Sequence, residues 1–223
     1  MADQIVIREI QKNDHALLEQ TIAKTWKFAE RFSNKTAVIL SKACLLDFLA
    51  EQTFTRVSVV NGSVIGVIMG ISKNKRKVQL HYVLPLLLVG LRLCLTSEGR
   101  IAVKGYSVIK RIYQRLLKRS KKSYDAELSF FVVDPSYRGL GLGKRLFQCF
   151  IQYMKEEKVS NFFLYTDTEY NYRFYDKQGM QKQCEEDFAL DFSYRGNRNE
   201  FNGTCFLYDY SVCGQGENSN AVV

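Results

Sequence analysis

The chain has 223 residues, of which 46 % are hydrophobic and 25 % charged, and a formal net charge of +9. With only 2 Pro and 14 Gly, this composition is that of a folded globular protein and excludes a disordered, collagen-like or Pro-rich chain. The longest apolar stretch, Val83 to Leu95, has 13 residues and contains Pro85 and Arg92. It is too short to span a bilayer, which needs about 20 apolar residues, and indicates a core or interfacial helix.

Cysteine and histidine spacing argues against a metal site. The six cysteines contain no CxxC pair, and His15 and His81 lie far from any pair of cysteines. We therefore expect no metal, and the cysteines are interpreted as small core residues. Residues 1–4 lack the features of a secretory signal, so a cytoplasmic location with reduced thiols is expected.

The N-terminal segment predicts a strand followed by two helices. Ile5–Ile10 alternates loosely and is typical of a strand, and apolar residues at helical spacing follow from Asp14. Ser41 is the expected N-cap of the second helix, because a serine oxygen can accept a hydrogen bond from a first-turn amide.

A β-hairpin is expected next. The apolar runs Arg56–Val60 and Val64–Ile71 flank the dipeptide Asn61-Gly62. This dipeptide tolerates the positive φ angles of a type I′ turn, so it predicts a tight connection between two antiparallel strands.

The segment from Lys73 to Lys122 carries the whole basic excess. It holds 14 Lys or Arg residues and a single acidic residue, Glu98. Its second half predicts an amphipathic helix, in which Ile112 and Leu116 lie on the apolar face. Such a segment could attract a polyanion, an anionic lipid surface or a phosphorylated cofactor, or it could be a solvated helix face; composition leaves these alternatives open.

The C-terminal half alternates strands and helices. Leu128–Val133 is a continuous apolar run typical of a strand covered on both faces, and Asp134-Pro135 ends it. The expected elements after it are a helix to about Lys158, a strand over Asn161–Thr166, a short helix over Asn171–Lys177 that ends at Gly179, two strands at about Cys184–Asp191 and Thr204–Val212, and a frayed tail.

A glycine-rich turn, residues 138–144, lies between the Leu128–Val133 strand and the following helix. Glycines let the backbone approach an anion, and the first-turn amides of a helix point into the same space, so a diphosphate would fit. A dinucleotide fingerprint fails because Lys144 stands in place of the third glycine. A P-loop fails because Arg138 replaces its first glycine and Arg145 its magnesium-binding hydroxyl. A tight turn without a ligand is the remaining structural alternative.

Two motifs give the chain a family resemblance. Arg138-Gly-Leu-Gly-Leu-Gly143 resembles the R/Q-x-x-G-x-G/A signature of the GNAT acyl-CoA N-acyltransferase superfamily. Tyr170 to Met180 resembles that superfamily's FYxxxGF segment, with Met180 in place of Phe. The likeness covers Ala126 to about Gln181, and more weakly the order of elements along the chain.

The resemblance implies an α+β (mixed α/β) GNAT fold. Its central sheet is mixed, mostly antiparallel and flanked by helices, and it splays open after the strand at 128–133. It further implies a single domain over residues 1–213, with a basic helical insert at about 76–122 and a flexible tail at 214–223.

The resemblance also implies acetyl-CoA as co-substrate. The backbone of residues 131–133 would pair with the pantetheine arm, and the amides of residues 138–144 would bind the diphosphate. Where the family often has an asparagine that contacts the cofactor, this chain has Thr168, and Asn171 is a candidate for that role, one helical turn before Tyr175. The implied cofactor-binding residues are Phe131, Val132, Val133, Arg138, Gly139, Leu140, Gly141, Leu142, Gly143, Lys144 and Asn171.

Two further residues are catalytic candidates by the same resemblance. Tyr175 occupies the position whose tyrosine commonly protonates the departing thiolate, and Glu127 resembles a strand-borne glutamate that serves as general base. The structural alternatives are a half-buried aromatic ring for Tyr175 and a solvated strand-end residue for Glu127.

The expected function is that of an N-acetyltransferase that moves an acetyl group directly from acetyl-CoA to an amine of a small molecule, peptide or protein. Two alternatives stay open: a non-catalytic acyl-CoA-binding regulatory module, and a basic protein that associates with nucleic acid or a membrane surface. A homodimer is also compatible with the sequence.

Overall fold

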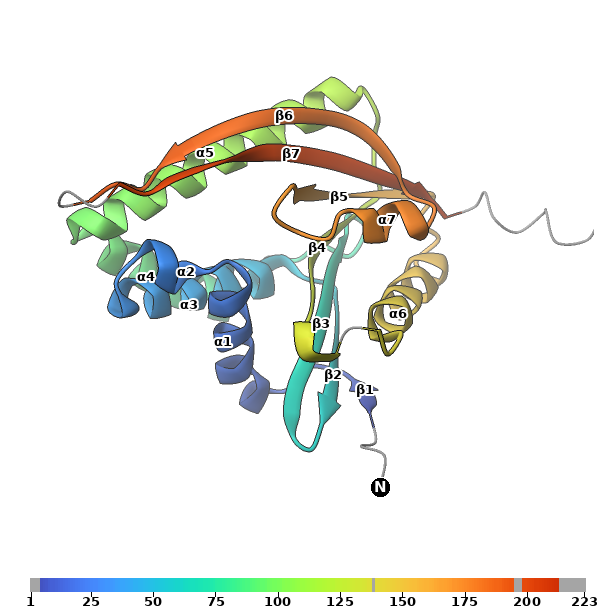
Figure 1. The fold of residues 1–223 in the computed structure, drawn as a ribbon. Helices are drawn as coiled ribbons and strands as arrows, with labels where there is room; N and C mark the ends of the chain where they lie inside the picture. Colours follow the sequence, from blue (N-terminus) through green and yellow to red (C-terminus); the bar gives the residue numbers. More distant parts are fainter. Residues whose placement is uncertain (1–4, 138, 195–197, 213–223) are drawn as a thin grey trace, which may run out of the picture.

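Seven strands form one sheet in the order β1-β2-β3-β4-β5-β7-β6 (Figure 1). The computed structural model describes residues 5–137, 139–194 and 198–212, so Arg138 and the expected tail at 214–223 lie outside the described residues. All neighbouring strands pair antiparallel except β4 and β5, which are parallel. The predicted mixed, mostly antiparallel sheet is therefore confirmed. The strands are β1 Val6–Arg8, β2 Phe54–Val60, β3 Ser63–Ser72, β4 Ala126–Val133, β5 Asn161–Asp167, β6 Gln181–Asp191 and β7 Glu200–Ser211.

Helices cover both faces of this sheet. Alternate residues of a strand point to opposite faces, and on β3 Ile68 belongs to the core beneath α6, whereas Val67 and Met69 belong to the core beneath α1 and α3. Helix α5 covers β5, β6 and β7 on the face opposite α6. The helices are α1 His15–Thr25, α2 Phe28–Arg31, α3 Asn34–Glu51, α4 Leu80–Cys94, α5 Ser97–Ser120, α6 Leu142–Glu156 and α7 Arg173–Lys177, with short 3-10 turns η1 Lys12–Asp14 and η2 Pro135–Tyr137.

The hairpin between β2 and β3 has the predicted turn. Asn61 and Gly62 both adopt positive φ, at 49° and 78°. Positive φ at both central residues is the type I′ geometry, which matches the right-handed twist of the paired strands.

The predicted start of the second long helix is wrong. Helix α3 begins at Asn34, and Ser33 is its N-cap, whose side chain accepts a hydrogen bond from the Thr36 amide. Ser41 is buried inside the helix, where its Oγ donates to the Ala37 carbonyl at 2.8 Å. A serine that bonds to the carbonyl four residues before it can lie in a helix interior, so its preference for the cap does not decide its position.

The C-terminal strands also begin earlier than predicted. The sequence indicates strands from Cys184 and Thr204, whereas β6 begins at Gln181 and β7 at Glu200. The added residues of β6, residues 181–183, are polar and mostly exposed, because β6 is an edge strand with solvent on one side, and those of β7, residues 200–203, include one large apolar side chain, Phe201. The apolar pattern that marks a buried strand is absent from such residues.

Two helical glycines provide a test of the packing between α5 and the sheet. A Cβ added at Gly105 of α5 would lie 2.4 Å from Cε1 of the Phe192 ring, whereas a Cβ at Gly90 of α4 would meet nothing within 4 Å. Gly105→Ala is expected to lower the free energy of unfolding by about 1–3 kcal/mol through this overlap. Gly90→Ala is expected to raise it by about 0.5–1 kcal/mol through helix propensity. Urea unfolding measures both, and equal shifts in the two variants would contradict the packing.

Candidate active site

Strands β4 and β5 separate soon after they pair. The register joins Ala126 to Phe162 and Glu127 to Phe163. Beyond Glu127, β4 continues alongside β3 as far as Val133, and β5 continues alongside β7 as far as Asp167. Figure 1 shows the two strands diverging from this point. The backbone groups on this edge of β4 therefore lack a neighbouring strand and are available to another partner.

A β-bulge in β4 changes which side chains face each side of the sheet. Phe130 pairs with Met69 and Leu128 pairs with Gly70, so Ser129 is the extra residue. As a result, Leu128 belongs to the core under α6, whereas Phe130, two residues on, belongs to the core under α1 and α3. The bulge lies at the start of the unpaired edge, directly before the residues 131–133 that were predicted to pair with pantetheine.

The turn before α6 has the geometry expected of an anion site. Gly139 and Gly141 adopt positive φ, at 84° and 72°, and Gly141 is the N-cap of α6 without a side-chain cap. The first-turn amides of a helix have no partner within the helix and carry the positive end of its dipole. The first turn of α6 has no acidic residue, and Lys144 and Arg145 are exposed there. Main-chain and side-chain charge thus both favour an anion at this point.

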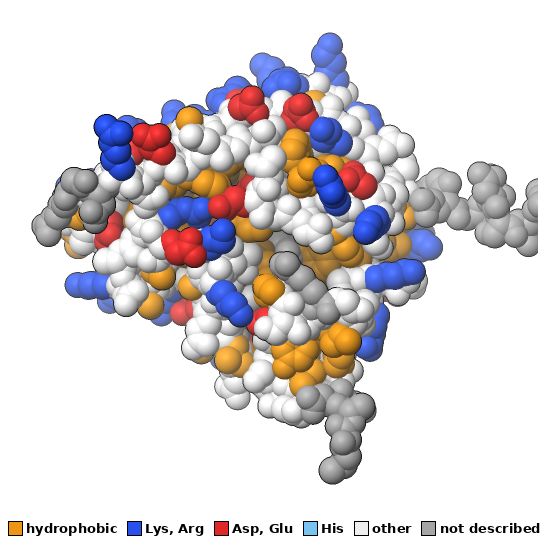
Figure 2. Space-filling view, in the orientation of Figure 1, with side chains coloured by type: hydrophobic (Ala, Val, Ile, Leu, Met, Phe, Trp, Pro, Cys, Tyr) orange, Lys and Arg blue, Asp and Glu red, His pale blue; other side chains and the backbone are white. Residues whose placement is uncertain are grey.

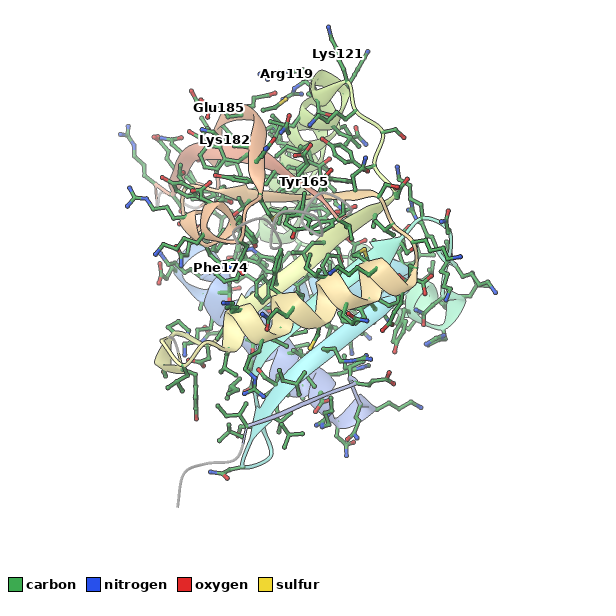
Figure 3. The ribbon with its side chains drawn as sticks, turned by 90° about the vertical axis from the view of Figure 1, so that its right-hand side faces the viewer. Arg119, Lys121, Tyr165, Phe174, Lys182 and Glu185 are labelled. Atoms are coloured by element: carbon green, nitrogen blue, oxygen red, sulfur yellow. The ribbon has the colours of Figure 1, made fainter. Side chains whose placement is uncertain are left out.

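Phe174 is a residue of this site that the sequence did not single out. Its ring lies 5.4 Å from the Phe131 ring of β4 and 6.0 Å from the Phe147 ring of α6. A Cβ added at Gly143 would meet the same ring at 3.3 Å. Figure 3 shows Phe174 beside the N-terminal end of α6, and Figure 2 shows hydrophobic side chains in the hollow between α7 and α6. Phe174 therefore forms a wall beside the strand edge and the first turn of α6; its sequence signal is its place as the first residue of the FYxxxGF-like segment.

Glu127 is in an enclosed, partly charged environment on the face opposite α6. Its side chain is only partly exposed, and burial raises the pKa of its carboxyl, while the positive charges of Lys110 and Arg76 act in the opposite direction. Both cations are themselves held by carboxylates: the Lys110 Nζ lies 3.3 Å from Asp47, and the Arg76 guanidinium lies 2.6 Å from Glu51. A desolvated carboxylate with a raised pKa is suited to accept a proton.

Tyr175 approaches from the other face of the sheet. It lies on α7 and packs against the core under α6, with its ring 5.5 Å from the Phe174 ring and 6.0 Å from the Tyr208 ring. Burial raises the pKa of its phenol. A phenol with a raised pKa stays protonated at neutral pH and can donate a proton.

The predicted cofactor contact near α7 is partly corrected. Helix α7 begins at Arg173, so Asn171 precedes the helix and does not lie one helical turn from Tyr175 within it. The Asn171 carbonyl accepts a hydrogen bond from the Phe174 amide at 3.0 Å. The Thr168 amide donates to the Thr204 carbonyl, and the Thr168 Oγ1 accepts from the Thr204 amide. Thr168 thus extends the contact of β5 with β7.

Asp167, at the end of β5, is a second titratable group that the sequence did not indicate. Burial raises the pKa of its carboxyl to about 6, although its Oδ1 accepts a hydrogen bond from the Glu169 amide. It is four residues after Phe163 on the strand, on the face that α5 covers and toward which Glu127 also points. Two carboxyl groups therefore share this face.

Comparisons with known proteins bear on the sequence motifs and the fold. A family model described as the acetyltransferase (GNAT) family matches residues 90–180, which include the glycine-rich turn and α7. Among solved structures, SsHAT aligns with a TM-score of 0.59 and 13 % identity over 94 % of this chain and 98 % of that chain. The N-acetyltransferase from Staphylococcus aureus Mu50 aligns with a TM-score of 0.51 and 13 % identity over 94 % and 99 % of the two chains. An acetyltransferase of the GNAT family from the same organism aligns with a TM-score of 0.51 and 16 % identity over the same shares.

No curated protein matches the chain. At these identities the solved structures establish the fold alone, and the family model adds the sequence motifs of the turn and α7. Residues 90–180 of the chain are thus similar to the GNAT acetyltransferase family, and the chain as a whole shares the fold of the solved acetyltransferases.

Proposed function

We propose that this protein is an N-acetyltransferase that transfers an acetyl group from acetyl-CoA directly to an amine. The observation that carries the proposal is the edge of β4 that has no neighbouring strand after Glu127, together with the uncapped N-terminus of α6, the helix that follows β4. An elongated ligand with a peptide-like arm and a diphosphate needs a free strand edge at one end and a helix N-terminus at the other. Phe131, Val132 and Val133 would bind the arm, and residues 139–144 would bind the diphosphate. The same role for Arg138 stays a sequence prediction.

Glu127 and Tyr175 would act on opposite sides of the thioester. The amine gives up a proton to the Glu127 carboxylate, directly or through water, and its nitrogen attacks the thioester carbonyl. The tetrahedral intermediate collapses, the carbon–sulfur bond breaks, and the thiolate takes the phenolic proton of Tyr175. The products are the amide and free CoA, and the enzyme returns to its starting state when Glu127 releases the amine proton to solvent and Tyr175 takes up one proton from solvent.

The acceptor is proposed to be a neutral or acidic amine, either a small molecule or a peptide. The support is the basic excess of the segment from Lys73 to Lys122, which disfavours polycations; the two cations of this segment nearest Glu127, Lys110 and Arg76, are themselves balanced by Asp47 and Glu51. Helices α4 and α5, which carry most of the basic excess, are proposed to be an insert within a single domain.

Tyr175→Phe is the variant that separates an enzyme from a non-catalytic CoA-binding module. It is expected to lower kcat about 10- to 100-fold with KM for acetyl-CoA nearly unchanged, because the thiolate loses its proton donor but the binding surface keeps its shape. Release of free thiol in the presence of a panel of amines measures the rate.

Tyr172→Phe is the matched control. Tyr172 directly precedes α7, and its ring packs against Phe206 at 5.1 Å. It is expected to keep at least half of the wild-type rate. Binding of acetyl-CoA without thiol release from the wild-type protein for any amine would favour the regulatory module instead.

A further inference from the structure

Helix α4 presents a row of exposed leucines to solvent. We call this row the leucine stripe; each member is between 56 % and 74 % exposed. Successive members are one, three or four residues apart, which puts all of them within an arc of about 100° around the helix. The members of the stripe are Leu80, Leu84, Leu87, Leu88, Leu91 and Leu95, the last directly after the helix.

The opposite side of α4 already supplies the contacts with the rest of the fold. Val89 and Leu93 are its buried residues, and the helix packs on α3 and α5. The helix thus has apolar residues on both its covered and its open side, a pattern that indicates a second burial environment for the open side. None of the helices in the described part of the chain has both the length and the apolar character needed to cross a membrane.

Three exposed basic residues lie before, on and after the helix that carries the stripe. Arg92 lies on α4 itself, Lys77 precedes the helix, and Arg100 donates to the Cys94 carbonyl at 3.0 Å, beside Leu95. No carboxylate among the described residues forms an ion pair with these three. The nearest acidic groups in the sequence are otherwise engaged: Glu51 binds Arg76, and Glu98 accepts hydrogen bonds from the Ser33 amide and hydroxyl at the start of α3.

We propose that α4 is a membrane-docking helix, which lies in the interface of an anionic phospholipid bilayer with the leucine stripe in the acyl region and Lys77, Arg92 and Arg100 at the headgroups. Leucines flanked by cations on a helix that lies in the membrane plane are the features that bind such surfaces. A second copy docked through the same face would bring the same three cations, which would repel those of the first copy. The stripe consists of leucines and contains no aromatic residue, whereas protein contacts rely on aromatic anchors.

Vesicle flotation with the full chain tests the proposal. Vesicles of phosphatidylcholine with about one third phosphatidylglycerol are expected to bind the protein at least about tenfold more than vesicles of phosphatidylcholine alone. The triple variant Leu84→Gln, Leu88→Gln and Leu91→Gln is expected to lose at least about 90 % of this binding. The double variant Lys77→Gln and Arg92→Gln is expected to bind less and with a weaker dependence on salt.

Val6→Gln is the matched control, because Val6 is 46 % exposed on β1, at the other side of the molecule (Figure 1). It is expected to bind the vesicles like wild type. All substitutions are at exposed positions, and an unchanged melting temperature checks that each variant folds. The proposal is overturned if the triple variant binds like wild type, or if binding is equal for the two vesicle types. It is also overturned if wild type ignores vesicles and sediments as a dimer that the triple variant converts to a monomer, which would assign the stripe to a second copy.

Discussion

Replacing Glu127 with Gln is expected to lower kcat for amine acetylation roughly 10²- to 10³-fold. The substitution keeps the size of the side chain and removes the group that takes the proton from the amine, and general bases contribute in this range. Binding of acetyl-CoA should be nearly unchanged, because Glu127 lies on the face of the sheet opposite α6 and Tyr175. Steady-state kinetics of thiol release and calorimetric titration with CoA measure the two quantities separately.

The pH profile gives the same variant a second readout. Because burial raises the pKa of Glu127, the carboxyl is protonated and inactive at low pH, and the rate should rise as the pH increases through that pKa. This ascending limb should be absent from Glu127→Gln. Asp167→Asn is the control, since Asp167 has a pKa of about 6 and lies on the same face. A limb that survives in Glu127→Gln and disappears in Asp167→Asn would assign the base to Asp167.

Gly141→Glu is expected to weaken CoA binding roughly 100-fold or more. Gly141 is the N-cap of α6, at a φ of 72°, so the new carboxylate would lie where the diphosphate is proposed to bind and would repel it. A side chain at this φ is also strained and costs about 1–2 kcal/mol of stability. Calorimetry with CoA measures the affinity.

Gly62→Glu separates these two effects. Gly62 has a φ of 78°, and a Cβ added at Gly62 or at Gly141 would meet nothing within 4 Å. Both variants therefore carry a similar backbone penalty, but Gly62 lies in the β2–β3 turn, away from α6. Gly62→Glu is expected to melt at a lower temperature and to bind CoA normally. Equal loss of affinity in the two variants would indicate that strain, and not charge, is responsible.

Local sequence patterns predicted most elements of the fold. The Asn61-Gly62 turn, the strand that ends before Asp134 and the amphipathic helix α6 are each determined by neighbouring residues, through φ preference or apolar spacing. The errors occur where the local preference is weak. Ser41 is compatible with both a cap and a helix interior, and the first residues of β6 are polar because β6 forms the edge of the sheet.

The sequence by itself determined the glycine-rich turn, its place before a helix and hence the anion-binding geometry, because positive φ and free helix amides are local properties. Only the tertiary structure decided the rest of the site. The open edge of β4 and the Phe174 wall depend on segments about 40 residues apart in the chain, and the charges around Glu127 come from α3, from α5 and from the loop before α4. The sequence also did not decide that the leucine stripe is exposed. A 15-residue apolar helix can be covered by protein on every side, and only the tertiary structure shows that one side of α4 faces solvent.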